Sequence, residues 1–139
     1  MNRVAAVICL FFANFAIADC ESTLTEAHAA LKKGNAYAAR SIEKLNQMQD
    51  MIKTDATNTE ICTAAQDTRM GAYLAAKRYK SSRSSFLSAV SECPSPYDAQ
   101  SAENADAMTA YYNKNAELVG VYDKLIVNNC AGNALAPTL

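Results

Sequence analysis

The feature that most constrains the fold is a helical spacing of apolar and small side chains along three long segments. In the first segment, about residues 22–53, these side chains recur every seven positions, and a second series follows three places later in each heptad. This spacing places both series on one face of a helix, whereas strand-type alternation is hard to find. The two series are Leu24, Leu31, Ala38, Leu45 and Ile52, and Ala27, Gly34, Ser41 and Met48.

The second segment covers about residues 57–93 and the third about residues 96–130, and both repeat apolar positions at spacings of four and three. Thr57 and Glu60 have the spacing of a capping box, in which each side chain bonds the other residue's backbone amide. Ser95 is a suitable N-cap for the third helix. Because the three segments are similar in length, the sequence predicts an all-α fold: an antiparallel three-helix bundle that runs up, down and up.

Two places in the sequence interrupt this helical pattern. Gly34 costs about 1 kcal/mol in a helix interior, and the next residue, Asn35, is a good cap for a new helix. The serine-rich run at residues 81–85 also favours helix poorly, because serine hydroxyls compete for backbone hydrogen bonds. We therefore expect a kink or a brief break at each of these places.

The first eighteen residues have the composition of a secretory signal peptide. Arg3 supplies a positive charge, residues 4–15 are almost wholly apolar, and Ala16 and Ala18 give the small-x-small pattern for cleavage. The apolar run is shorter than the roughly 20 residues that cross a bilayer. We predict a signal peptide over 1–18, a helical bundle domain over 19–132 and a flexible C-terminal tail over 133–139. The mature chain would have no transmembrane segment and would be periplasmic or extracellular.

Four cysteines remain once Cys9 leaves with the signal peptide, and an even number in an exported chain favours two disulfides. Cys20 starts the first predicted helix and Cys93 ends the second, so both lie at one end of the bundle. Cys62 and Cys130 lie at the opposite end. Bonded cysteines need Cα atoms within about 7 Å, and the other pairings would cross most of a rod roughly 45 to 50 Å long. The sequence therefore predicts Cys20–Cys93 and Cys62–Cys130.

Residues that could support catalysis or metal binding are sparse. His28 is the only histidine, and neither GxSxG nor CxxCH occurs, so nothing indicates a Ser-His-Asp site or a haem attachment. The mature cysteines lie 42, 31 and 37 residues apart, which is not the spacing of a zinc site. Without Arg3 the net charge is −2, from 12 basic and 14 acidic side chains, which disfavours nucleic acid. We expect no enzyme activity, no metal and no cofactor.

Two surfaces are candidates for binding. Tyr111, Asn115 and Leu118 share one stripe of the third helix, and tyrosine is enriched at protein interfaces; the alternative is packing at the edge of the core. A second candidate is a basic cluster on the second helix, which would suit an acidic partner or would complement the acidic third helix within the bundle. Its candidate binding residues are Lys77, Lys80 and Arg83.

These features favour an exported, non-catalytic binding protein of the inhibitor or immunity type, whose partner is another exported or envelope protein. The alternative is a carrier whose bundle core holds a small apolar ligand or cofactor. An enzyme that uses dispersed carboxylates comes third. The carrier would use the space left by small side chains between the helices, such as Ala38, Ser41, Ala72 and Ala75.

Overall fold

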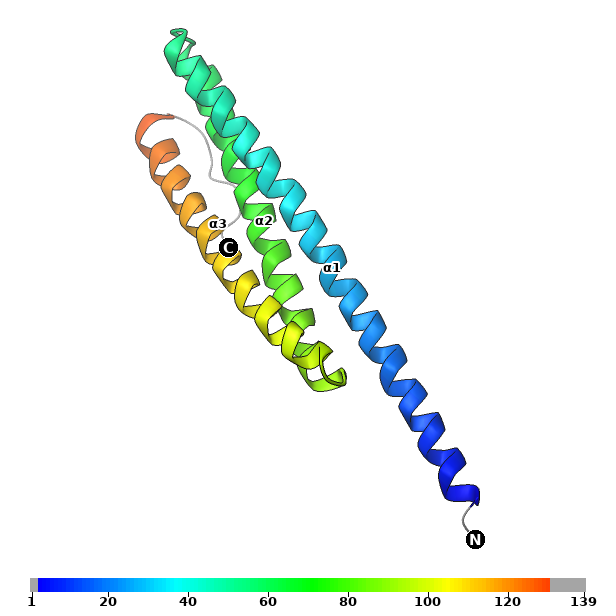
Figure 1. Ribbon diagram of the computed structural model, residues 1–139. Coiled ribbons are helices and arrows are strands. Elements are labelled where there is room, and N and C mark those ends of the chain that lie inside the picture. The colour runs from blue at the N-terminus through cyan, green and yellow to red at the C-terminus, as the bar shows by residue number, and fades with distance from the viewer. Residues whose placement is uncertain (1–2, 131–139) are drawn as a thin grey trace.

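A computed structural model describes the backbone of residues 3–130 and the side chains of residues 18–130. It contains helices α1 (Arg3–Lys53), α2 (Asn58–Glu92) and α3 (Tyr97–Asn129), with no strand among residues 3–130. The helices run up, down and up to form a rod (Figure 1). The predicted all-α, three-helix fold is therefore confirmed, and both α2 and α3 begin and end within one residue of the predicted segments.

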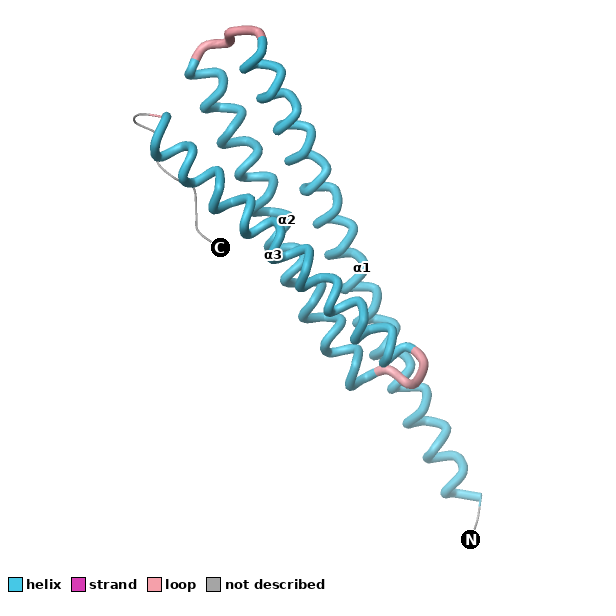
Figure 2. Tube along the Cα trace, turned by 60° about the vertical axis from the view of Figure 1, so that its left-hand side comes forward, coloured by secondary structure: helices cyan, strands magenta, loops and turns pink. Residues whose placement is uncertain are grey.

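Helix α2 lies between the other two helices and packs against both, whereas α1 and α3 have little contact with each other (Figures 1 and 2). The first part of α1 extends past the turn that joins α2 to α3 (Figure 1). This extension holds the predicted signal peptide, so α1 starts well before the predicted first helix. The predicted tail, residues 133–139, lies outside the described residues.

Both predicted disulfides are confirmed, and each joins two helix ends at one end of the rod. The Cys20–Cys93 bond has a Cα–Cα distance of 4.9 Å and closes a loop of 73 residues. At the other end, the Cys62–Cys130 bond has a Cα–Cα distance of 5.7 Å and a sequence separation of 68 residues. Such bonds persist in oxidising compartments, so the two disulfides indicate an oxidising, exported environment.

The predicted break at Gly34 is wrong, because α1 continues through it. A Cβ atom on Gly34 would lie 2.9 Å from the Tyr79 ring, so the glycine allows that ring to approach α1 closely. The neighbouring Asn35 accepts a hydrogen bond of 2.9 Å from the Tyr79 hydroxyl. Gly34 and Asn35 thus form a packing site for the Tyr79 side chain of α2, and the helix does not end there.

The predicted break at residues 81–85 is also wrong, because α2 is continuous there. Ser82 is buried, and its hydroxyl donates a 2.8 Å hydrogen bond to the backbone carbonyl of Ala27 on α1. Ser41 on α1 makes the reciprocal type of bond, 2.8 Å long, to the carbonyl of Thr68 on α2. These serines therefore join α1 to α2 at close range, and this contact outweighs their weak helix propensity.

The starts of α2 and α3 differ in how well the sequence predicted them. The capping box of α2 is confirmed, and hydrogen bonds from the Thr57 hydroxyl and amide lower the pKa of Glu60. In α3 the N-cap is Pro96 rather than the predicted Ser95, and the bond between them is cis. No side chain caps this helix start, although Asp98 lies in its first turn.

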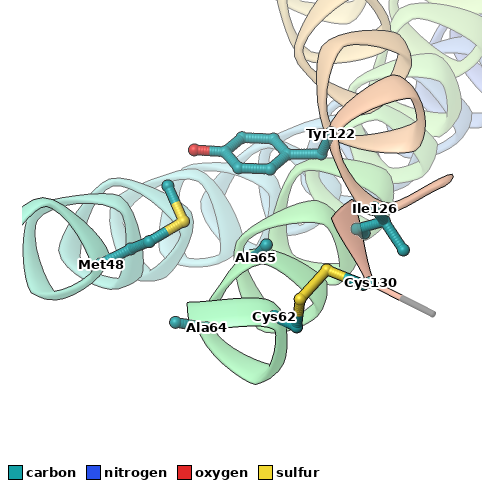
Figure 3. Close-up of a cluster of buried hydrophobic side chains, with 7 residues drawn as sticks. All are labelled: Met48, Cys62, Ala64, Ala65, Tyr122, Ile126 and Cys130. Carbon is teal, nitrogen blue, oxygen red and sulfur yellow. A yellow bond between two sulfur atoms is a disulfide. The ribbon is translucent and has the colours of Figure 1, made fainter. Parts of the chain in front are cut away.

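Larger side chains fill the core between α3 and its neighbours. Near the Cys62–Cys130 bond, Tyr122 and Ile126 of α3 form one buried cluster with Met48 of α1 and small residues of α2, and Tyr122 points toward Met48 (Figure 3). Toward the other end, a second cluster includes Phe86 of α2 and Met108 of α3. A buried arginine, Arg69, forms an ion pair with Asp123 of α3. The core thus runs along the whole rod and fixes the surfaces that α3 presents.

Candidate functional site

Tyr111 is the most exposed member of the predicted stripe on α3, with 47% of its surface accessible. Its ring lies against that of Tyr79, with centroids 5.3 Å apart and planes tilted by 40°. Tyr79 is buried and bonded to Asn35, and burial, followed by the nearby Tyr111, raises the pKa of its hydroxyl. The exposed ring of Tyr111 therefore packs against the Tyr79 ring, which burial and a hydrogen bond hold in place.

Asn115 and Leu118, the other members of the stripe, are half-buried. Asn115 donates a 2.8 Å hydrogen bond to the Tyr111 carbonyl. Leu118 packs against two core clusters, one around the Cys62–Cys130 bond and one around Val119. The structure brings these three residues together at the edge of the core, with Tyr111 as the side chain most available to a partner.

Tyr97 extends this stripe toward the start of α3 and was not among the predicted binding residues. It lies fourteen residues before Tyr111, which is two heptads along α3, and 51% of its surface is exposed. Asn104 lies midway and is half-buried. The seven-residue spacing of Tyr97, Asn104, Tyr111 and Leu118 was the sequence signal for this longer face. We call these four residues the α3 row.

A groove of about 640 Å³ lies at the Cys20–Cys93 end of the bundle, between α1 and the turn that leads into α3. Its lining is mainly apolar and includes Leu24, Pro94 and Tyr97, so the α3 row ends in this groove. His28 also lines it and meets the Phe86 ring edge-to-face, with centroids 5.3 Å apart. The remaining lining residues are Cys20, Glu21 and Thr25.

The basic residues Lys77, Lys80 and Arg83 are all exposed on α2. The Lys77 ammonium lies 5.5 Å from the centroid of the Tyr73 ring, and Arg83 Nε donates a 2.8 Å hydrogen bond to the Thr109 hydroxyl on α3. Among the residues with described side chains, none of these three cations forms an ion pair. Their contacts hold two of the side chains in place while the charges stay on the surface.

The positions proposed for an internal carrier site are tightly packed. Ser41, Ala72 and Ala75 are fully buried, and Ala38 is partly buried against the core. A Cβ atom on the neighbouring Gly71 would lie 3.0 Å from the Ser41 Cβ. At these positions the small side chains bring α1 and α2 together, and the groove described above is lined by other residues.

The chain matches no protein-family model, no curated protein and no solved structure. Among residues 18–130, no helix is long and apolar enough to span a membrane. In the same part of the chain, no group of three or more His, Cys, Asp or Glu side chains is arranged to hold a metal ion. The candidate binding surfaces of the described residues are the α3 row, the groove and the basic cluster.

Proposed function

We propose that the chain is an exported, non-catalytic binding protein of the inhibitor or immunity type, which acts on another exported protein. The observation that carries this proposal is the α3 row, in which Tyr97 and Tyr111 remain about half exposed. Tyrosine gives a large contact area at low cost in side-chain entropy. Because Tyr111 rests on the fixed ring of Tyr79, little further ordering is needed on binding.

Two features support export. Both ends of the rod are closed by disulfides, and the predicted signal peptide lies in the part of α1 that projects beyond the bundle (Figure 1). We expect a mature chain that begins at Asp19 in the periplasm or outside the cell. N-terminal sequencing of the exported protein tests this expectation, and retention of any residue from 1–18 would contradict it.

The binding proposal is tested by the Tyr111→Ala variant. We expect weaker capture of the partner from the envelope or secreted fraction of the native host, because an exposed aromatic contact is lost. The melting temperature should stay nearly unchanged, since about half of this side chain is already accessible. A large loss of stability with intact capture would assign Tyr111 to the core and remove the basis of the proposal.

The basic cluster is a second place where this partner could bind, and charge reversal separates it from the α3 row. If Lys80 and Arg83 form the contact, the double variant Lys80→Glu, Arg83→Glu should weaken capture, and added salt should weaken capture by the unmodified chain. Capture that is insensitive to both changes would exclude this surface and leave Tyr111 as the test position.

The carrier remains a second candidate function because of the groove. Its volume of about 640 Å³ falls within the range of small-molecule sites, about 300 to 1,000 Å³. A neutral apolar fluorescent probe should then bind saturably, and Leu24→Lys should abolish that binding by placing a charge in the apolar lining. Absence of saturable binding would remove the carrier from consideration.

A further inference from the structure

The end of the bundle that holds the groove is also its acidic end. The stretches 19–31 of α1 and 84–103 of α2 and α3 meet there and contain no lysine or arginine. The whole chain has 14 acidic and 13 basic side chains, and these two stretches carry six of the acidic and none of the basic ones. The acidic residues in these two stretches are Asp19, Glu21, Glu26, Glu92, Asp98 and Glu103.

Carboxylates border the apolar lining of the groove. Glu21 belongs to its wall. Glu92 lies at the same end of the bundle but outside the lining of the groove, where it accepts a 2.7 Å hydrogen bond from the Thr23 hydroxyl. Asp98 follows the lining residue Tyr97 directly in the first turn of α3. An occupant of the groove would therefore meet an apolar floor, with the bordering carboxylates of Glu21 in its wall and Asp98 beside Tyr97.

We propose that the groove docks a cationic, apolar peptide segment of the exported partner. Apolar side chains of that segment would pack against Leu24, Pro94 and Tyr97, and its lysines or arginines would reach the bordering carboxylates. Long basic side chains suit this arrangement because their stems cover apolar surface while their charges stay in water. An arginine or lysine over the exposed Tyr97 ring gains a cation–π contact. This inference rests on the proposed binding function and specifies the chemistry of the partner.

Charge complementarity is the reason for choosing this occupant. The bordering carboxylates attract a basic segment and increase its association rate, while they repel an acidic one. Tyr97 is common to the groove and the α3 row. A single partner can therefore extend from the groove along α3 to Tyr111 and contact both the groove and the α3 row.

The experiment uses three short amidated peptides of equal length and the oxidised chain purified from an exporting host. One peptide alternates leucine and lysine, the second leucine and glutamate, and the third serine and lysine. We expect saturable binding of the leucine–lysine peptide alone, measured by fluorescence anisotropy and weakened by salt. Amide shifts in an NMR titration should concentrate at residues 20–28 and at Ser95 and Tyr97, because Pro94 and Pro96 have no amide hydrogen.

A charge-reversal pair shows whether binding occurs at the groove. Glu21→Lys should weaken binding of the leucine–lysine peptide about three- to tenfold, because one attraction becomes a repulsion. Glu43→Lys makes the same change in net charge at an exposed position of α1 away from the groove, and we expect less than about a twofold effect. Equal effects of the two variants would overturn the proposal.

Other occupants give distinguishable results. Binding of the leucine–glutamate peptide, or of a neutral apolar probe in place of the leucine–lysine peptide, would contradict the proposed cationic segment. Concentration-dependent dimerisation that Glu21→Lys prevents would give the groove to a second copy of the chain and would also overturn it. If no peptide binds while Tyr111→Ala still weakens partner capture, this inference fails and the proposed function survives.

Discussion

The two interfaces that α2 makes are built in opposite ways. Toward α1, small residues pack closely and serine hydroxyls bond backbone carbonyls, as Ser82 bonds that of Ala27, while Gly34 leaves room for the large ring of Tyr79. Toward α3 the contacts are large side chains such as Ile126 and a buried ion pair, Arg69 with Asp123. We infer that larger side chains would overpack the first interface, whereas smaller ones would leave cavities in the second.

The largest expected effect comes from removing either disulfide. Replacing Cys62 and Cys130 with alanine should lower the free energy of unfolding by about 4 kcal/mol, by the entropy of closing a 68-residue loop. Removing Cys20–Cys93 should cost nearly the same, since its loop has 73 residues. Chemical denaturation of the two variants measures both costs. Clearly unequal values would show that loop entropy alone does not explain them, and that the α1–α2 and α2–α3 interfaces contribute differently to the free energy of unfolding.

The next effect concerns the α2–α3 interface. Ile126 is almost completely buried, so Ile126→Ala should leave a cavity and cost about 3 kcal/mol, within the usual range for such truncations. The midpoint of urea unfolding should fall without a change in slope. A cost below about 1 kcal/mol would mean that the disulfide, rather than the packing of Ile126 in the core, holds α3 against α2.

A smaller effect is expected at the α1–α2 interface, where one added methyl group is enough to lower the free energy of unfolding. A Cβ on Gly71 would lie 3.0 Å from Ser41 Cβ and 3.1 Å from its Cα, so Gly71→Ala should cost about 1 to 3 kcal/mol through overpacking. Gly120→Ala is the matched control, because a Cβ at Gly120 meets no atom within 4 Å.

The control variant should gain roughly 0.5 to 1 kcal/mol, because alanine favours helix more than glycine. If both variants were stabilised, α1 and α2 would not be in close contact at Gly71. Thermal unfolding of the two proteins, measured side by side, gives the sign of each change.

The bundle and its disulfides could be predicted because they follow from three segment lengths and from the positions of the cysteines within them. Cys20 and Cys93 have to meet whenever α1 and α2 are straight and antiparallel. The continuity of the helices could not be predicted in the same way. Gly34 and Ser82 signal either a helix break or a close helix–helix contact, and only the neighbouring helix decides between them.

The candidate site was predicted in part. Tyr111, Asn115 and Leu118 do lie together, because residues of one helix at this spacing share a face. The groove was missed, since its walls come from residues 20–28 and 94–97, which are distant in sequence and have no shared motif. Two signals were present, the seven-residue spacing of Tyr97 within the α3 row and the absence of lysine and arginine from both stretches.

The most direct test of the proposed binding function is site-specific photo-cross-linking in an exporting host, with a photoreactive phenylalanine analogue in place of Tyr111. Val127 is the matched control, since it lies on the same helix and is 65% exposed. We expect one covalent adduct at position 111, with a partner that is itself an exported protein, and no such adduct at position 127. The same adducts at both positions, or none at position 111, would contradict the proposed binding function.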